Sequence, residues 1–311
     1  MTTPLARVRA FAPGSVGNVG PGLDILGLAV TGPGDAVVAE RTNESGVTIR
    51  WPGHPDLPVE PGRNSAGLAA REVLLRAGAA SLGVALTIEK GLPLAGGQGG
   101  SAASAVAAAV AVNALLGDPL DRRTLLEACL AAEERVAGRH GDNVAPSLFG
   151  GMILIRDLDA LDLVPIPVPD ELRVVLAHPD QRLPTAEGRA RLPMEVPRAV
   201  ALHQAAQVAA MVAALAAGDY ALLGRALDDR IAEPARAPLL PGFREAKAAA
   251  LAAGALGASI SGSGPTAFAL AVGDERARAV AAAMTEAYRE AGVPCSARVA
   301  QVDRRGARVE G

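Results

Sequence analysis

The spacing of apolar and polar residues divides the chain into strands and helices separated by glycine-rich loops. Alternation of apolar and polar positions predicts strands, whereas apolar residues three or four positions apart predict helices. In the first half, strands are predicted over 6–12, 36–40, 47–51, 84–89 and 152–155, and helices over 65–77, 101–116 and 120–136. In the second half, strands are predicted over 173–177, 258–260, 266–272 and 297–302, and helices over 197–217, 220–231, 243–251 and 274–291.

This order of elements predicts an α+β protein in two halves. A stretch rich in proline and aspartate, 157–171, separates them, and we place one domain at 1–165 and a second at 166–311. A chain of 311 residues is long enough for two medium-sized domains that share a cleft.

Composition narrows the classes of partner. Half of the residues are hydrophobic but only 2% are aromatic, and the formal net charge is −3 without a block of Lys or Arg. We therefore expect no nucleic-acid partner and no anionic membrane surface. The first fifteen residues lack the apolar run of a signal peptide, and the apolar stretch 102–116 is too short to span a bilayer. These features favour a cytoplasmic protein.

The segment 96–104 carries the strongest chemical signal. Its glycine run leads into a predicted helix, so several backbone N–H groups and the positive helix end would face one point, as at a phosphate site. A plain helix start with a flexible linker is the competing interpretation. The chain has no Walker-type Gly-Lys-Ser/Thr. The loose dinucleotide fingerprint occurs twice, in incompatible contexts, and is not followed by the acidic strand end that a Rossmann fold needs.

Three segments together resemble the signatures of the GHMP kinases. They lie in order at 12–24, 93–104 and 260–269. The segments 140–151, 185–193 and 233–236 are similar to the homoserine kinase branch of that family. The chain departs from the usual pattern at Gly100, where serine is common, and at Leu23, where phenylalanine is common. The missing hydroxyl at position 100 could weaken contacts to nucleotide or metal.

The resemblance implies a fold and a reaction. The fold would combine an N-terminal half like domain 2 of ribosomal protein S5 with a ferredoxin-like C-terminal half, and the active site would lie between them. The reaction would be ATP- and Mg²⁺-dependent phosphorylation of L-homoserine in threonine biosynthesis, by a homodimer. It also implies the ATP-binding residues, which are Asn64, Pro93, Gly96, Gly97, Gln98, Gly99, Gly100, Ser101, Ala102, Ser104, Gly262, Ser263 and Gly264.

The family pattern assigns further roles to polar residues that would otherwise be interpreted as surface or turn residues. Ser101 and Glu133 would hold Mg²⁺, with Glu134 as the competitor for the second position. The substrate would contact Asn18, Asp24, His140, Thr185, Arg189 and Arg236.

Two asparagines are the predicted catalytic residues. Asn18 would orient the acceptor hydroxyl, and Asn143 stands where some relatives place an aspartate that acts as the base. With no strong base, direct in-line transfer is expected, because positioning and charge stabilisation supply most of the acceleration in phosphoryl transfer.

Two alternative functions remain open at this point. One is another GHMP small-molecule kinase, of the mevalonate or shikimate type, although a neutral alcohol has no use for two arginines. The other is a non-catalytic nucleotide sensor of the same fold, an alternative left open by the missing hydroxyl at Gly100. A hydrolase is disfavoured because the chain has no Gly-x-Ser-x-Gly elbow.

Overall fold

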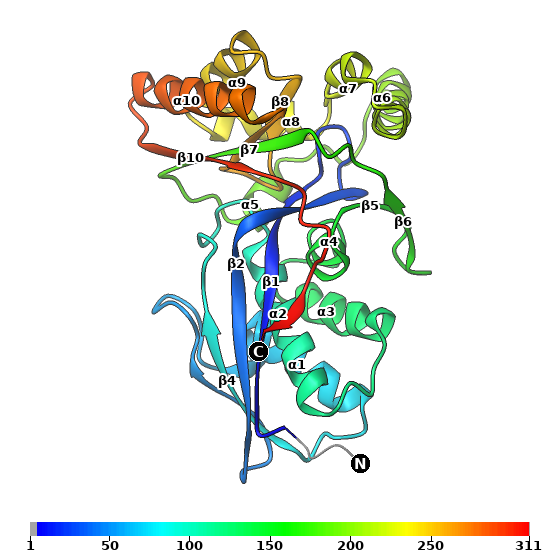
Figure 1. The fold of residues 1–311 in the computed structure, drawn as a ribbon, viewed down its shortest axis with the longest axis vertical. Coiled ribbons are helices and arrows are strands. Elements are labelled where there is room, and N and C mark those ends of the chain that lie inside the picture. The colour runs from blue at the N-terminus through cyan, green and yellow to red at the C-terminus, as the bar shows by residue number, and fades with distance from the viewer. Residues whose placement is uncertain (1–4, 311) are drawn as a thin grey trace.

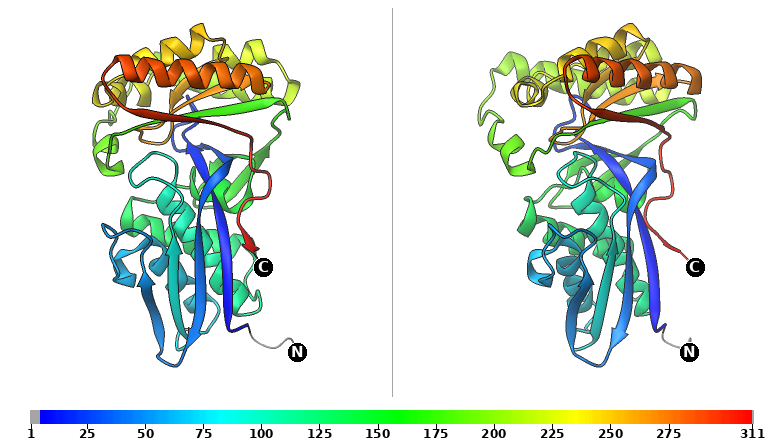
Figure 2. Two further views of the ribbon diagram at one scale, coloured as in Figure 1. Left: turned by 60° about the vertical axis from the view of Figure 1, so that its left-hand side comes forward. Right: turned by 90° about the vertical axis from the view of Figure 1, so that its left-hand side faces the viewer.

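The computed structural model describes residues 5–310, which form two lobes stacked along the long axis of the molecule (Figures 1 and 2). A seven-stranded sheet with helices α1–α4 builds the first lobe, and a four-stranded sheet with helices α6–α10 builds the second. The predicted α+β class is therefore confirmed.

The first lobe is built on two long strands. These are β1 (Arg7–Gly17) and β2 (Leu26–Thr42), which pair antiparallel. The sheet runs in the order β11-β1-β2-β4-β3, and β5 adds a hairpin with β6 to the start of β2. The remaining strands are β3 (Gly46–Trp51), β4 (Gly83–Glu89), β5 (Met152–Asp157), β6 (Asp162–Ile166) and β11 (Arg308–Glu310).

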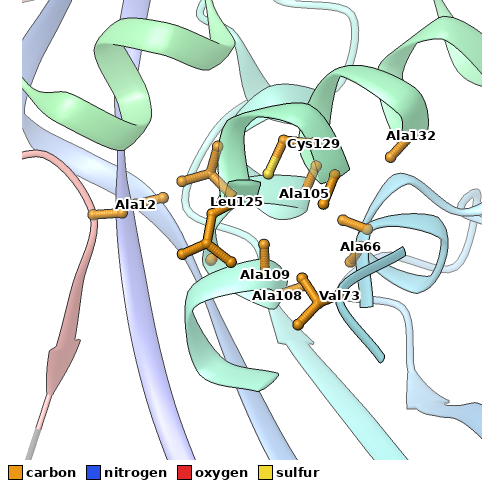
Figure 3. Close-up of a cluster of buried hydrophobic side chains, with 14 of the residues drawn as sticks. Ala12, Ala66, Val73, Ala105, Ala108, Ala109, Leu125, Cys129 and Ala132 are labelled. Carbon is orange, nitrogen blue, oxygen red and sulfur yellow. The ribbon is translucent and has the colours of Figure 1, made fainter. Parts of the chain in front are cut away.

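The helices of the first lobe cover one face of this sheet. They are the 3₁₀ turn η1 (Pro61–Arg63), α1 (Ser65–Arg76), α2 (Gly100–Leu115), α3 (Arg122–Val136) and α4 (Val144–Phe149). Asn64 and Asp121 cap α1 and α3 by accepting hydrogen bonds from first-turn N–H groups. Helix α2 is alanine- and valine-rich on all sides and lies buried between α1, α3 and the sheet (Figure 3). Its small side chains let the neighbouring backbones approach closely, which suits a core almost without aromatic rings.

The second lobe has the strand order β10-β7-β9-β8, antiparallel throughout. Its strands are β7 (Leu172–Pro179), β8 (Gly257–Ile260), β9 (Ala267–Val272) and β10 (Cys295–Ala300). Its helices are α5 (Thr185–Ala190), α6 (Arg198–Ala217), α7 (Tyr220–Ala226), α8 (Ala232–Arg236), the 3₁₀ turn η2 (Ala237–Leu239), α9 (Phe243–Ala252) and α10 (Asp274–Glu290). Helices α9 and α10 pack on one face of the sheet, and the other face shares a core with the first lobe, where Phe268 and Leu176 join Leu26 and Leu28. The lobes are thus held by a continuous apolar contact.

Most predicted elements are present, with informative differences. The predicted strand 6–12 continues to Gly17, and 36–40 is only part of the 17-residue β2. The helix predicted to reach residue 231 ends at Ala226. Elements α4, α5, α8, β6 and β11 were not predicted, because three to six residues carry too few apolar positions to show a period. Strand β11 pairs with β1, so the last residues of the second predicted domain join the first sheet.

One helix in the described part of the chain, α6, is long and apolar enough by composition to cross a membrane. Sequence analysis singled out 102–116 instead, which is the buried α2. In the fold α6 packs Met211, Ala214 and Leu215 into the core that joins the lobes. Of its most apolar window 22% is buried, so the rest of α6 lies at the surface of the second lobe.

Candidate active site

A cavity of about 390 Å³ lies where the two lobes meet. It collects side chains and backbone from segments more than 240 residues apart, such as Asn18 and Gly262. The predicted site residues that line it are Asn18, Asn64, Pro93, Gly96, Gly97, Gly99, Gly100, Ser101, Ala102, Ser104, Glu133, His140, Asn143, Thr185, Arg189, Arg236, Gly262 and Ser263. Three predicted residues, Asp24, Gln98 and Gly264, lie outside this lining.

The glycine loop and the start of α2 form one wall of the cavity. Gly97 and Gly99 have positive φ values of 73° and 69°, a conformation that glycine adopts without strain. A Cβ atom on Gly99 would overlap Ser15 Oγ and lie 2.9 Å from Asn143 Oδ1. The first turn of the 16-residue α2 leaves N–H groups without intrahelical partners, and Gly100, Ser101 and Ala102 all line the cavity. This wall suits a phosphate group.

Gly100 differs from these two glycines. It is the first residue of α2, and a Cβ there would lie 3.3 Å from Lys90 Nζ and 3.5 Å from Pro93 O. The backbone at position 100 therefore does not require glycine. A Cβ at position 100 would need only a small adjustment of its neighbours.

Ser101 on α2 and Glu133 on α3 lie in contact at the cavity wall. Ser101 Oγ donates a hydrogen bond to Glu133 Oε1. Glu133 is 7% exposed, and burial raises the pKa of its carboxyl group to about 7, against the opposing effects of Ser101 and Lys90. Glu134, the competitor in the sequence, is exposed and does not line the cavity.

This pair fits Mg²⁺ by its chemistry. Mg²⁺ is usually held by one or two carboxylates with substrate phosphates and water completing the octahedron, and Ser101 and Glu133 supply two hard oxygens beside the phosphate wall. Residues 5–310 contain no group of three His, Cys, Asp or Glu side chains able to hold a metal ion by themselves. Any Mg²⁺ here would therefore depend on a phosphate ligand.

The side-chain amide of Asn18 joins the first and third glycine-rich segments. Its Nδ2 donates to Gly262 O at 2.9 Å, and its Oδ1 accepts from the Asp24 N–H at 3.0 Å. Its backbone, at a φ of 68°, donates to Asp142 Oδ2 at 3.0 Å. Asn143 accepts from Ser15 Oγ at 2.9 Å. Both predicted catalytic amides thus lie at the cavity and are held in place by the protein.

Arg189, which lines the cavity, is paired with Asp24 of the first lobe, which lies just outside the lining. Arg189 Nη2 lies 2.7 Å from Asp24 Oδ1, and its Nη1 donates to Asp24 Oδ2 at 3.1 Å. Burial opposes ionisation of Asp24, but the hydrogen bond and charge of Arg189 outweigh it and lower the pKa of the carboxyl group. Burial and Arg189 together lower the pKa of His140.

Several buried polar groups at this end have few protein partners or none. Arg236 is 1% exposed and donates only to the carbonyls of Gly188 (3.2 Å) and Gly262 (2.9 Å), with no carboxylate within 4.0 Å among the described residues. His140 Nε2 and Arg189 Nε are buried without a hydrogen-bond partner within residues 5–310. Because buried polar groups are costly unless they are paired, this end of the cavity is prepared for an anionic group of a ligand.

Asn64 and Gln98 lie in the predicted region but use their side chains elsewhere. Asn64 accepts from the N–H groups of Ala66 and Gly67 as the cap of α1, and donates to Pro58 O at 3.0 Å. Gln98 faces away from the cavity, where its amide contacts Thr266 and Arg298. Its main-chain carbonyl accepts from Ser15 N at 3.1 Å. Both residues shape the cavity through the backbone.

The sequence analysis did not identify a buried ion pair beneath the glycine loop. Lys90 is paired with Asp35, and its Nζ donates to Gly100 O at 2.9 Å and to Ser104 Oγ at 3.1 Å. Asp35, fully buried, also accepts from Gly91 N and Leu92 N. Lys90 is one of only two lysines among the 30 Lys and Arg residues, and it stands directly before the loop. This position was the feature of the sequence that could have indicated its role.

Asp142 is a second residue that the sequence analysis missed. It is 3% exposed, lines the cavity and accepts from the Asn18 N–H. Burial, reinforced by the charge of Asp24, raises the pKa of its carboxyl group to about 6. Its place beside His140 in the 140–151 segment was a signal, but only the fold shows that the carboxylate faces Asn18.

Comparisons with known proteins agree with this geometry. The chain matches the family models for the GHMP kinases N terminal domain over residues 64–151 and for GHMP kinases C terminal over residues 211–290. A homoserine kinase of Arabidopsis thaliana is 44% identical over 97% of this chain and 84% of its own. A homoserine kinase of Chloroherpeton thalassium is 42% identical over 92% of this chain and 93% of its own.

Solved structures give the same result. The crystal structure of a homoserine kinase from Cytophaga hutchinsonii superposes with a TM-score of 0.95 at 37% identity, covering 100% of this chain and 99% of that one. L. major mevalonate kinase, at 18% identity and a TM-score of 0.72 over 98% of this chain and all of its own, shares the fold.

Proposed function

Because this chain belongs to the GHMP kinases, and among them to the homoserine kinases, we propose that it transfers the γ-phosphate of ATP to the hydroxyl group of L-homoserine. The products are ADP and O-phospho-L-homoserine, an intermediate of threonine biosynthesis. One observation carries the proposal. A single cavity combines a phosphate-binding helix start with Arg236, a buried guanidinium with no carboxylate within 4.0 Å among residues 5–310. This combination suits a phosphate donor next to a small carboxylate-bearing acceptor.

ATP would lie along the wall formed by 93–104, with its phosphates against residues 96–101 and the start of α2. The adenine would lie toward the Asn64 end of the cavity, where Leu57, Pro58 and Ile88 provide apolar surface. Ser263 of the third glycine-rich segment lines the same cavity, and Gly264 supports the loop because its carbonyl lies behind Gly97. The Lys90–Asp35 pair would keep the loop and the first turn of α2 in register for the phosphates.

Mg²⁺ would be held by Ser101 and Glu133. When bound, the ion offsets the charge of the phosphate oxygens during transfer. Glu133 is suited to this role because its carboxylate is buried beside the phosphate wall, and its existing hydrogen bond to Ser101 places both oxygens together. The exposed Glu134 is not suited to it.

Homoserine is a zwitterion, and the Asp24–Arg189 pair offers a complement to both of its charges. The ammonium group would take the place of the guanidinium at Asp24, and the carboxylate would bind Arg189 and Arg236. A guanidinium fork matches a carboxylate in two hydrogen bonds. Thr185 and the unpartnered Nε2 of His140 lie at the same end of the cavity and would complete the site.

Transfer would be direct. The homoserine hydroxyl oxygen forms a bond to the γ-phosphorus as the bond between that phosphorus and the β,γ-bridging oxygen breaks, and the hydroxyl proton leaves to the transferred phosphate or to solvent. Asn18 and Asn143 would hold the hydroxyl in line, each fixed by a hydrogen bond to the surrounding protein. Such positioning supplies much of the acceleration in phosphoryl transfer.

The test is a coupled assay of ADP release with Mg-ATP, offering L-homoserine, mevalonate, shikimate, galactose or no acceptor. We expect turnover with homoserine, and a phosphate monoester signal in the ³¹P spectrum of the product. Turnover with another acceptor instead would assign the chain to a different small-molecule kinase. ATP binding without turnover on any acceptor would favour a nucleotide sensor.

Three further expectations remain proposals. The family resemblance leads us to propose a homodimer, which light scattering on the purified chain would test. A cytoplasmic location, testable by cell fractionation, accompanies the proposed metabolic role. Division of the chain into domains at 1–165 and 166–311 would be tested by limited proteolysis near residue 165, where the shared apolar core and the β11–β1 pairing should keep the two pieces together after cleavage.

A further inference from the structure

A second hollow, here called the rear pocket, lies on the other side of the glycine loop from the proposed ATP cavity. Its volume is about 620 Å³. Lys90, Pro93 and Leu94 line both spaces, so this segment is the wall between them. The far wall of the rear pocket is formed by the second lobe, with His178 on β7 and Ser296 and Arg298 on β10.

Arg298 is the unusual residue of this pocket. Its Nη1 donates to Thr31 O at 2.8 Å and its Nη2 to Gln98 Oε1 at 3.2 Å, both neutral acceptors. No carboxylate lies within 4.0 Å of its guanidinium among residues 5–310. Burial lowers the pKa of Arg298, and no acidic side chain counters this effect. A guanidinium has five N–H donors, so the two hydrogen bonds leave donors free for a ligand.

The other charges of the pocket do not neutralise Arg298. Lys90 is paired with Asp35, and Arg182 lies 3.2 Å from Asp56. Asp180 lines the pocket but is exposed and makes no ion pair in the described part of the chain. The pocket is therefore electropositive around Arg298, whose part-buried guanidinium has no carboxylate partner within the described residues.

We propose that the rear pocket binds a small oxyanion on Arg298, of the kind shared by phosphate, phosphate monoesters and small polycarboxylates. Ser296 is two residues before Arg298 on β10, so both side chains lie on the same face of the strand and the Ser296 hydroxyl provides a further donor. The pocket is distinct from the site where ATP and homoserine are placed. It adjoins that site through Gln98, whose side chain accepts from Arg298 and whose backbone lies in the glycine loop.

The test is calorimetric titration of potassium phosphate, and separately of potassium citrate, into protein already saturated with magnesium, a non-hydrolysable ATP analogue and L-homoserine. Occupying both the ATP and the proposed homoserine positions first keeps the anions from binding in the active-site cavity, where Arg189 and Arg236 lie. We expect one phosphate site in the unaltered protein, weakened at least about tenfold in Arg298→Gln because charge-assisted hydrogen bonds are lost. Citrate binding with the same dependence on Arg298 would place the natural ligand among carboxylates, and phosphate binding alone would place it among phosphates.

Two further variants make the test decisive even if Arg298→Gln is unstable. Ser296 is exposed, so Ser296→Glu should fold, and its tethered carboxylate should occupy Arg298 and weaken phosphate binding. Arg304→Gln removes an equal charge outside the pocket and should leave phosphate binding unchanged. Absence of phosphate and citrate binding in the unaltered protein would overturn the proposal, as would binding that survives both Arg298→Gln and Ser296→Glu.

Discussion

Asp24 and Arg189, 165 residues apart in the chain, form a two-point ion pair that joins the lobes at the end of the active-site cavity. In the proposed function, Asp24 binds the ammonium group of homoserine and Arg189 binds its carboxylate. When homoserine binds, its ammonium group replaces the Arg189 guanidinium at Asp24, and its carboxylate replaces the Asp24 carboxylate at Arg189. The cost of separating the pair is then offset when homoserine binds.

Replacing Arg189 should therefore affect the acceptor and spare ATP. We expect Arg189→Met to raise KM for homoserine by about 10- to 100-fold, the loss of one or two charge-assisted hydrogen bonds. KM for ATP should change by less than about twofold, since Arg189 belongs to the proposed homoserine site and not to the residues proposed to contact ATP. Initial rates over both substrates measure this, with the exposed Arg191→Met as the matched control. An equal rise in both KM values would contradict the assignment.

Asn18 should matter for turnover more than for nucleotide affinity. Asn18→Ala removes the amide that holds the Asp24 N–H and Gly262 O, and with it the proposed orientation of the hydroxyl. We expect kcat to fall by about 100-fold, as for loss of one positioned transition-state contact. The Kd for ATP, measured by calorimetry, should stay within about threefold because the glycine loop is untouched. An unchanged kcat would refute the role of Asn18.

The two adjacent glutamates separate the Mg²⁺ assignment from general charge effects. Glu133→Gln should raise the Mg²⁺ concentration for half-maximal activity by at least about tenfold, because a neutral amide is a poorer ligand for a hard cation. Glu134→Gln removes the same charge one residue away, on the exposed side of α3, and should leave the Mg²⁺ concentration for half-maximal activity unchanged. Titration of Mg²⁺ at saturating ATP and homoserine measures both. Equal effects in the two variants would point to bulk electrostatics.

The glycine-rich wall could be predicted from the sequence because its chemistry is local. Residues 96–101 and the start of α2 are consecutive, so a glycine run followed by a helical pattern is enough to predict an anion site. Glu133 was suggested by the family resemblance alone, with Glu134 as the competitor, and only the fold shows that Glu133 is buried and Glu134 exposed.

Contacts between distant segments could not be predicted in this way. Lys90 and Asp35 are 55 residues apart, and Asn18 and Gly262 are 244 apart. The local sequence pattern does not show that the Asn18 side-chain amide donates to the third glycine-rich segment. It also does not show that the Gln98 side chain points away from the active-site cavity. The short elements that carry Thr185, Arg189 and Arg236 are likewise set by packing between lobes, since five or six residues cannot specify a helix alone.

The raised pKa of Asp142 should make the folded protein less stable as pH rises. Burial raises the pKa of this carboxyl group to about 6, above its ordinary value of 3.8, so the folded state binds the proton more tightly. Stability is therefore lost between about pH 4 and pH 6, and the penalty is complete above that range.

Asp142→Asn keeps the acceptor for the Asn18 N–H without this charge. We expect it to be more stable than the unaltered protein by about 1–3 kcal/mol at pH 7.5, with the difference vanishing near pH 4. Denaturant unfolding at both pH values measures the effect, and the exposed Asp159→Asn serves as the control. A difference of the same size at pH 4 would show that ionisation is not its cause.

Gly99 and Gly100 are neighbours whose replacement should have opposite consequences. Gly99 has a φ of 69°, and a Cβ there would overlap Ser15 Oγ and crowd Asn143, so Gly99→Ala meets both backbone strain and a steric clash. Backbone strain of this kind costs about 1–3 kcal/mol, and we expect the Kd for ATP to rise by at least about tenfold as the loop shifts. Gly100 begins α2, and the nearest atom to a Cβ there is Lys90 Nζ at 3.3 Å, which would need to shift by only a few tenths of an ångström.

Gly100→Ser should therefore be accepted without loss of stability, and its hydroxyl adds a donor at the first turn of α2, where the ATP phosphates are placed. We expect the Kd for ATP to stay equal or fall by up to about tenfold, the range of one added hydrogen bond to a charged group. Calorimetry with Mg-ATP on the two variants measures both effects under one set of conditions. If Gly100→Ser weakened ATP binding as much as Gly99→Ala, the loop would require glycine at both positions. The absence of serine at position 100 would then be a constraint of this fold rather than a tolerated departure from its relatives.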